Sequence, residues 1–136
     1  MVILFDRFNL PEDIYEVIFA TNQQKIVGKL LIDHIKSNNN EIGKTEMSMF
    51  ATQLHEGSLI TSIDEPAFKG KKVKISYNKR QFYDRILTPM KSMGIIDYDL
   101  YKKTYKLSDK FNKEMIRIGL MWLQELRNPP FRLKKK

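Results

Sequence analysis

The stretch that decides the fold runs from Ser76 to Ser108 and has the sequence SYNKRQFYDRILTPMKSMGIIDYDLYKKTYKLS. Ser76 can cap a helix over about 77–93, and Gly94 can end that helix in a left-handed conformation from which a strand leaves without a loop. Two short strands, at about 95–98 and 104–107, are joined by a turn with two lysines at its tip. Ser108 can cap another helix, so the segment predicts helix, hairpin and helix in direct succession.

This order resembles the second half of a winged helix-turn-helix domain of bacterial and archaeal transcription regulators. In that family the recognition helix ends in a glycine, two aliphatic residues begin the first wing strand, the return strand carries an aromatic residue and a leucine, and a serine or threonine caps the next helix. The matching residues here are Gly94, Ile95, Ile96, Tyr105, Leu107 and Ser108. The resemblance implies a mainly α fold with a small β-hairpin wing, extra N- and C-terminal helices, and double-stranded DNA as partner.

Two features depart from that pattern. Pro89 lies inside the expected recognition helix, where proline removes a hydrogen bond and kinks the chain. The connection from Glu56 to Ser76 is also much longer than the three or four residues of a compact helix-turn-helix. Either residues 57–75 are an insertion, or a short helix lies near Asp64–Phe68.

The rest of the chain predicts helices over about 9–20, 21–37, 45–56 and 109–127. Val73–Ile75 alternates and predicts a very short strand, while the apolar start, Met1–Phe5, is typical of an edge strand or strap. The 136 residues fit one domain, 1–136, with a strap and helix (1–20), a winged-helix core (21–107), a C-terminal helix (108–127) and a basic tail (128–136).

Charge is distributed unevenly along the chain. Residues 1–68 carry five Lys/Arg and ten Asp/Glu, a net charge of −5, whereas residues 69–136 carry nineteen and six, a net charge of +13. Such asymmetry indicates a polyanionic partner, although a solvated lysine surface would have the same composition. The chain has no cysteine, which fits a cytoplasmic setting, and no apolar run approaches the length of a membrane span.

Helical spacing divides the expected recognition helix into two faces. Phe82, Ile86, Met90 and Met93 share the face that should enter the core. The opposite, polar face predicts base contacts from Arg80 and Gln81, with phosphate contacts from flanking basic residues and from the wing lysines. The alternative is an ordinary polar surface helix. The complete predicted DNA-binding set is Lys72, Lys74, Ser76, Tyr77, Asn78, Lys79, Arg80, Gln81, Asp84, Arg85, Thr88, Lys91, Lys102 and Lys103.

The C-terminal helix has more apolar surface than a terminal helix needs. One stripe contains Phe111, Met115, Ile118, Trp122 and Leu126, and a second contains Ile116, Leu120 and Leu123. We expect one stripe to pack on the core and the other on a second copy of the chain, with a dimer contact through Ile116, Leu120, Leu123 and Trp122. A homodimer would set two recognition helices about 34 Å apart on a palindromic site. The alternative is one helix buried by the N-terminal helices.

The sequence argues against an enzyme, a metal site or a cofactor. Its two histidines, His34 and His55, have no ligand spacing, and Lys69–Lys71 lacks the spacing of a phosphate-binding loop. Asp97 and Asp99 are poorly placed for a metal. The expected function is therefore sequence-specific DNA binding by a dimeric transcriptional regulator. The main alternative is a winged-helix protein–protein module of a transcription or replication assembly, and RNA binding is a third option.

Overall fold

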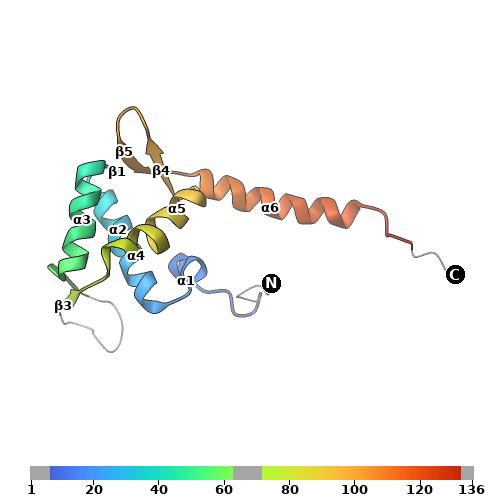
Figure 1. Cartoon of the computed structure of the whole chain (residues 1–136). Coiled ribbons are helices and arrows are strands. Elements are labelled where there is room, and N and C mark those ends of the chain that lie inside the picture. Colours follow the sequence, from blue (N-terminus) through green and yellow to red (C-terminus); the bar gives the residue numbers. More distant parts are fainter. Residues whose placement is uncertain (1–6, 63–71, 133–136) are drawn as a thin grey trace.

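The computed structural model describes residues 7–62 and 72–132, with the backbone alone described at 59–62 and 72–75. The fold is mainly helical, with a small three-stranded antiparallel sheet (Figure 1). In chain order the elements are α1 (Ile14–Ile18), α2 (Asn22–Ser37), β1 (Glu41–Gly43), α3 (Lys44–Glu56), β2 (Leu59–Ser62), β3 (Lys72–Ile75), α4 (Lys79–Phe82), η1 (Tyr83–Leu87), α5 (Thr88–Ser92), β4 (Ile96–Asp99), β5 (Thr104–Leu107) and α6 (Lys110–Arg127).

The core lies between α2, α3 and the helical segment α4–α5. Phe82 is fully buried, and its ring packs 5.6 Å from that of Phe50 on α3. Ile86 and Met90 follow Phe82 on the same face and are also buried, as the helical spacing predicted, while Met93 is half-buried. Each fully buried side chain of this size contributes about 1.5–3 kcal/mol, so this face anchors the segment in the body.

The helical segment α4–α5 is continuous from Lys79 to Ser92 but contains a π-helical turn, η1, just before Pro89. Proline has no N–H to donate and its ring collides with the carbonyl four residues earlier, so the hydrogen-bond pattern must change there. The irregularity predicted at Pro89 therefore takes the form of a widened turn. The segment also begins later than predicted, because Asn78 rather than Ser76 is the N-cap.

The three-stranded sheet has the order β1-β5-β4. The hairpin β4–β5 forms where it was predicted, with Ile96 opposite Leu107 and Tyr98 opposite Tyr105. Gly94, which precedes it, has the expected positive φ of 83°, and a Cβ there would lie 2.9 Å from the Cβ of Lys110. Strand β1 was not predicted, since only three residues are extended and only Ile42 is buried.

The long connection between α3 and α4 contains a β-hairpin. Strand β2 pairs antiparallel with β3, from Leu59 opposite Ile75 to Ser62 opposite Lys72. Strand β2 was not predicted, whereas the short strand predicted at 73–75 is confirmed as part of β3. The possible helix near Asp64–Phe68 and the strap Met1–Phe5 lie outside the described residues.

The N-terminal helix is shorter than predicted. Helix α1 spans five residues, and its N-cap, Asp13, accepts a hydrogen bond from the Tyr15 N–H at 2.9 Å. Burial, with the nearby carboxylates of Asp33 and Asp13, raises the pKa of Tyr15 to about 12. Pro11 disfavours a helical conformation at Leu10, and residues 7–13 form turns and bends rather than the start of the predicted helix.

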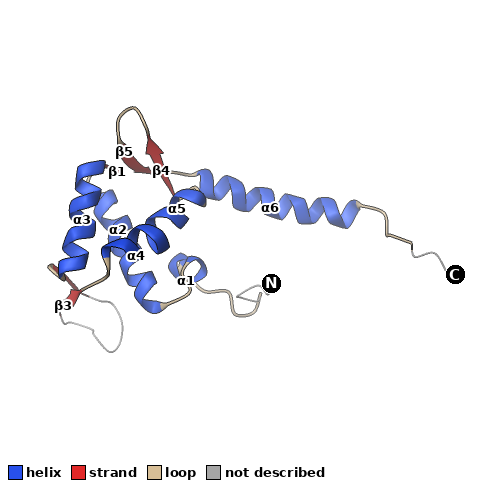
Figure 2. Cartoon of the chain, in the orientation of Figure 1, coloured by secondary structure: helices blue, strands red, loops and turns tan. Residues whose placement is uncertain are grey.

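Helix α6 projects from the body as a separate rod (Figure 2). None of its residues, all of which the structure describes, is buried, and Phe111 alone is half-buried. The expectation that one apolar stripe covers the chain's own core was therefore wrong. Helical spacing shows that an apolar face exists but does not say what it faces. Within the described residues, no helix combines the length and apolar character needed to cross a membrane.

Candidate nucleic-acid interface

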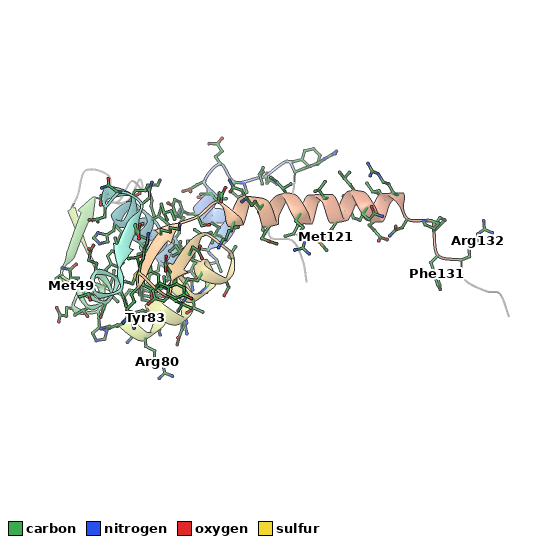
Figure 3. The ribbon with its side chains drawn as sticks, turned by 90° about the horizontal axis from the view of Figure 1, so that it is seen from above. Met49, Arg80, Tyr83, Met121, Phe131 and Arg132 are labelled. Carbon is green, nitrogen blue, oxygen red and sulfur yellow. The ribbon has the colours of Figure 1, made fainter. Side chains whose placement is uncertain are left out.

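The outer face of the α4–α5 segment is polar and open to solvent. Six of the predicted contact residues lie on it and are exposed: Arg80, Gln81, Asp84, Arg85, Thr88 and Lys91. Figure 3 shows the Arg80 side chain extending away from the body, and 91% of that side chain is exposed. The opposite face of the segment is buried in the core, and this burial fixes the direction in which the outer face points.

The one acidic residue on this face is paired with an arginine. Asp84 Oδ2 lies 3.8 Å from Arg80 Nε, one helical turn away. The structure therefore pairs Asp84, one of the predicted DNA-binding residues, with Arg80. Both side chains are largely exposed, so the pair contributes little to stability and leaves the guanidinium free to exchange partners.

The N-terminus of the segment is bound to α3. Lys79 is half-buried, and its Nζ donates to Thr52 Oγ1 at 2.9 Å and to Ser48 Oγ at 3.5 Å. Its backbone N–H donates to His55 Nδ1 at 3.1 Å. Lys79, predicted as a phosphate contact, therefore holds α4 against α3 instead. Sequence spacing alone could not reveal the role of His55, because 24 residues separate it from Lys79.

Two other predicted residues at this end have structural roles. Tyr77 is 5% exposed and belongs to the core, so its prediction as an outer-face residue was wrong. It precedes the helix, so helical spacing does not give its direction, and its N–H donates to the Leu54 carbonyl. Asn78 Oδ1 accepts from the Gln81 N–H at 3.1 Å, the bond expected of an N-cap. Ser76 is exposed beside them, and Lys72 and Lys74 lie on β3, where only the backbone is described.

The tip of the hairpin β4–β5, residues 99–103, which was predicted as the tip of a wing, is a turn built on Asp99. Its Oδ1 accepts hydrogen bonds from the N–H groups of Tyr101 (2.9 Å) and Lys102 (3.1 Å). These bonds, led by that from Lys102, hold the pKa of Asp99 below its ordinary value. Lys102 and Lys103 are exposed, as predicted, and the Lys103 carbonyl accepts from the Lys44 N–H at the start of α3. The tip is thus tied to the body while its lysines face solvent.

Sequence reasoning missed the apolar part of the wing tip. Tyr101 is 98% exposed and Leu100 is 76% exposed, directly before the two lysines. Neither side chain belongs to the hydrophobic core, so both are open to contact with another molecule. The sequence did contain one sign of this exposure, because both residues lie at the turn of the hairpin, where a side chain cannot reach the core.

Lys91 connects the helical segment with the wing. Its Nζ lies 5.7 Å from the Tyr98 ring centroid and 5.9 Å from that of Tyr105, within cation–π distance. Burial first, and then the neighbouring Tyr83 and Tyr98, raise the pKa of Tyr105. The lysine remains exposed between the helix and the hairpin, so it can contact a phosphate that lies across both.

Comparison with known proteins finds no matching family model, no matching curated protein and no matching solved structure. The geometry of the α4–α5 segment and the wing is therefore the basis for assigning a function.

Proposed function

We propose that the chain is a winged helix-turn-helix protein that binds double-stranded DNA sequence-specifically. The observation that carries this proposal is one helical segment whose apolar face is locked in the core and whose opposite face exposes Arg80, Gln81 and Arg85. An α-helix fits the major groove of B-form DNA, where the base edges are distinguishable. The segment α4–α5 would lie in that groove.

The order of the elements supports the resemblance to winged-helix regulators. Helices α2 and α3 precede α4–α5, and the hairpin β4–β5 follows it directly through Gly94. Strand β1 lies beside β5 and extends the hairpin into a sheet, and the hairpin β2–β3 is inserted before α4. The proposal thus uses α4–α5 as recognition helix and β4–β5 as wing.

The exposed basic residues of the helical segment and of the hairpin tip would have roles in this arrangement. Arg80 and Gln81 would contact base edges near the start of the helix, where Arg pairs best with guanine and Gln with adenine. Arg85, Lys91 and the wing lysines, Lys102 and Lys103, would contact phosphates on either side of the groove. From residue 79 to residue 107 the chain carries seven Lys/Arg and three Asp/Glu, a net charge of +4, which suits a phosphate backbone.

A salt titration tests this proposal most directly. Binding of the full chain to a labelled duplex is measured between 50 and 200 mM salt, a range over which a protein with several phosphate contacts loses affinity steeply, by roughly 0.9 in the log–log slope per phosphate. Selection of bound fragments from random DNA then tests sequence specificity. An affinity that does not change with salt would contradict the proposal.

Paired variants locate the interface. Arg80→Ala with Arg85→Ala should weaken duplex binding by at least about tenfold, because a base contact and a phosphate contact are lost, and should reduce the salt slope by about 1, because only the Arg85 contact is to a phosphate. Lys29→Ala with Lys36→Ala removes the same charge from exposed positions of α2 and should leave most of the affinity. Equal losses in the two variants would indicate that only net charge matters.

The alternative of a protein-docking module also has an observation in its favour, the exposed pair Leu100 and Tyr101 at the wing tip. A docking module would retain its partner after the Arg80/Arg85 substitution and lose it after Tyr101→Ala. A DNA-binding regulator of the kind proposed would act in the cytoplasm, alongside the DNA of the bacteria and archaea whose regulators it resembles.

A further inference from the structure

Helix α6 exposes an apolar surface that nothing in the described chain covers. Seven large apolar side chains on one side of the helix, from Met115 to Leu126, are between 43% and 64% exposed: Met115, Ile116, Ile118, Leu120, Trp122, Leu123 and Leu126. Figure 3 shows Met121 on this rod, which extends beyond the folded body. At roughly 100 Å² left open per side chain, the helix exposes about 700 Å² per chain, close to the ~800 Å² that each partner buries in a standard interface.

The apolar surface is one continuous band centred on a glycine. At 100° per residue, it covers roughly 200° of the helix circumference, from Ile118 on one side to Leu120 on the other. Gly119 lies in the middle of this band and is the tenth of the eighteen residues of α6. A Cβ at Gly119 would meet no atom within 4 Å. A mid-helix glycine costs helix stability, and no part of the chain that the structure describes requires one here.

A glycine at the midpoint of an apolar helix face lets another helix backbone approach closely at that point. We propose that two copies of the chain dimerise through antiparallel α6 helices that cross at Gly119. In this register the apolar positions match on both sides of the crossing. Met115 lies beside the partner's Trp122, and Ile116 lies beside the partner's Leu123.

A groove at the base of α6 supports the antiparallel arrangement. It has a volume of about 220 Å³ and is lined mainly by apolar side chains of α1, the sheet and α6, among them Ile14, Ile18, Ile95, Leu107 and Phe111. Asn112 also lines it, and in the antiparallel register Asn112 is level with the partner's Leu126. Because α6 is about 27 Å long, a parallel partner would carry its Leu126 to the far end and leave this groove open.

This inference goes beyond DNA binding and does not depend on it, because α6 contributes no residue to the proposed interface. The first test is the mass of the full chain in solution, by sedimentation or light scattering from about 1 to 100 μM. A dimer is expected. A chain that remains monomeric at 100 μM, or forms only larger assemblies, overturns the proposal.

Two leucine variants test the crossing point. Gly119→Leu fills the space that the partner backbone would occupy and should raise the dimer dissociation constant by at least about tenfold. The control, Arg117→Leu, adds the same side chain roughly 160° away on the polar side of α6 and should leave dimerisation unchanged. Since no residue of α6 is buried, both variants should retain the folded body, as circular dichroism would verify. Equal dimerisation of Gly119→Leu and the parent chain would contradict a crossing at Gly119.

Cysteine cross-linking determines the direction of the helices, because the chain has no native cysteine. Met115→Cys mixed with Trp122→Cys should form a disulfide between the two variants, whereas neither variant alone should cross-link efficiently. Efficient cross-linking of each variant with itself would indicate parallel helices and overturn the antiparallel register. Duplex binding by a monomeric Gly119→Leu variant would separate the two proposals, since DNA binding can persist when dimerisation fails.

Discussion

The helical segment α4–α5 and helix α6 are both amphipathic, yet the protein uses their apolar faces differently. In α4–α5 the apolar face, with Phe82, Ile86 and Met90, is buried in the chain's own core. In α6 the apolar face, with Trp122 and Leu123, remains open to solvent. The buried face fixes the direction in which α4–α5 presents its polar residues, whereas the open face of α6 is available to another molecule. Apolar residues that recur at helical spacing therefore indicate that a helix face makes a contact. Only the tertiary structure shows whether that contact is within the chain.

The largest expected difference between the two helices concerns deletion of an aromatic ring. Phe82→Ala should lower the free energy of unfolding by about 3–5 kcal/mol, because it opens a cavity in the core. Trp122→Ala should change it by less than about 0.5 kcal/mol in a dilute, monomeric sample, since the ring touches no core residue. Urea unfolding followed by circular dichroism measures both. A large loss for Trp122→Ala at high dilution would show that α6 packs on its own body.

The N-caps of the two helices should also differ. Asn78→Ala removes the bond from Asn78 Oδ1 to the Gln81 N–H and should cost about 1 kcal/mol, while Asn78→Ser should keep most of the stability. Asp109→Ala at the start of α6 should cost less, because the Asp109 side chain makes no capping hydrogen bond. Thermal unfolding of the three variants gives the comparison. A larger loss of stability for Asp109→Ala than for Asn78→Ala would contradict this prediction.

The smallest expected effect lies in the wing between these helices. The pKa of Asp99 is lowered in the folded chain, so its contribution to stability is present above its ordinary pKa of 3.8 and is lost as the pH falls through the lower, folded value. The protection of the Tyr101 and Lys102 amides, taken as the ratio of the exchange rate of an unstructured amide to the observed rate at the same pH, should therefore fall below about pH 4. Asp99→Ala should show fast exchange at neutral pH as well. Protection that stays unchanged below about pH 4 in the parent chain would show that the carboxylate does not hold the turn.

Much of the candidate site was predictable because its signals are local. The apolar spacing of Phe82, Ile86 and Met90 directs the opposite face outward, and Gly94 adopts the left-handed conformation that the helix-to-strand junction needs. Tyr77 and Lys79 were misplaced because their partners, on α3, are more than twenty residues away in sequence. Strand β1 was missed for a similar reason, since its three residues are extended only because β5 pairs with them.

From the sequence alone follow a helical segment at about 77–93, which the structure places at 79–92, the hairpin after Gly94, the long C-terminal helix and the basic second half. Helical spacing, capping residues and a glycine act within a few residues of each other, and net charge is a matter of composition. The tertiary structure decided that Tyr77 enters the core, that Lys79 is held by α3, and that α6 stands clear of the body. These outcomes depend on contacts between distant segments, whose geometry is set by how the whole core packs rather than by any local pattern.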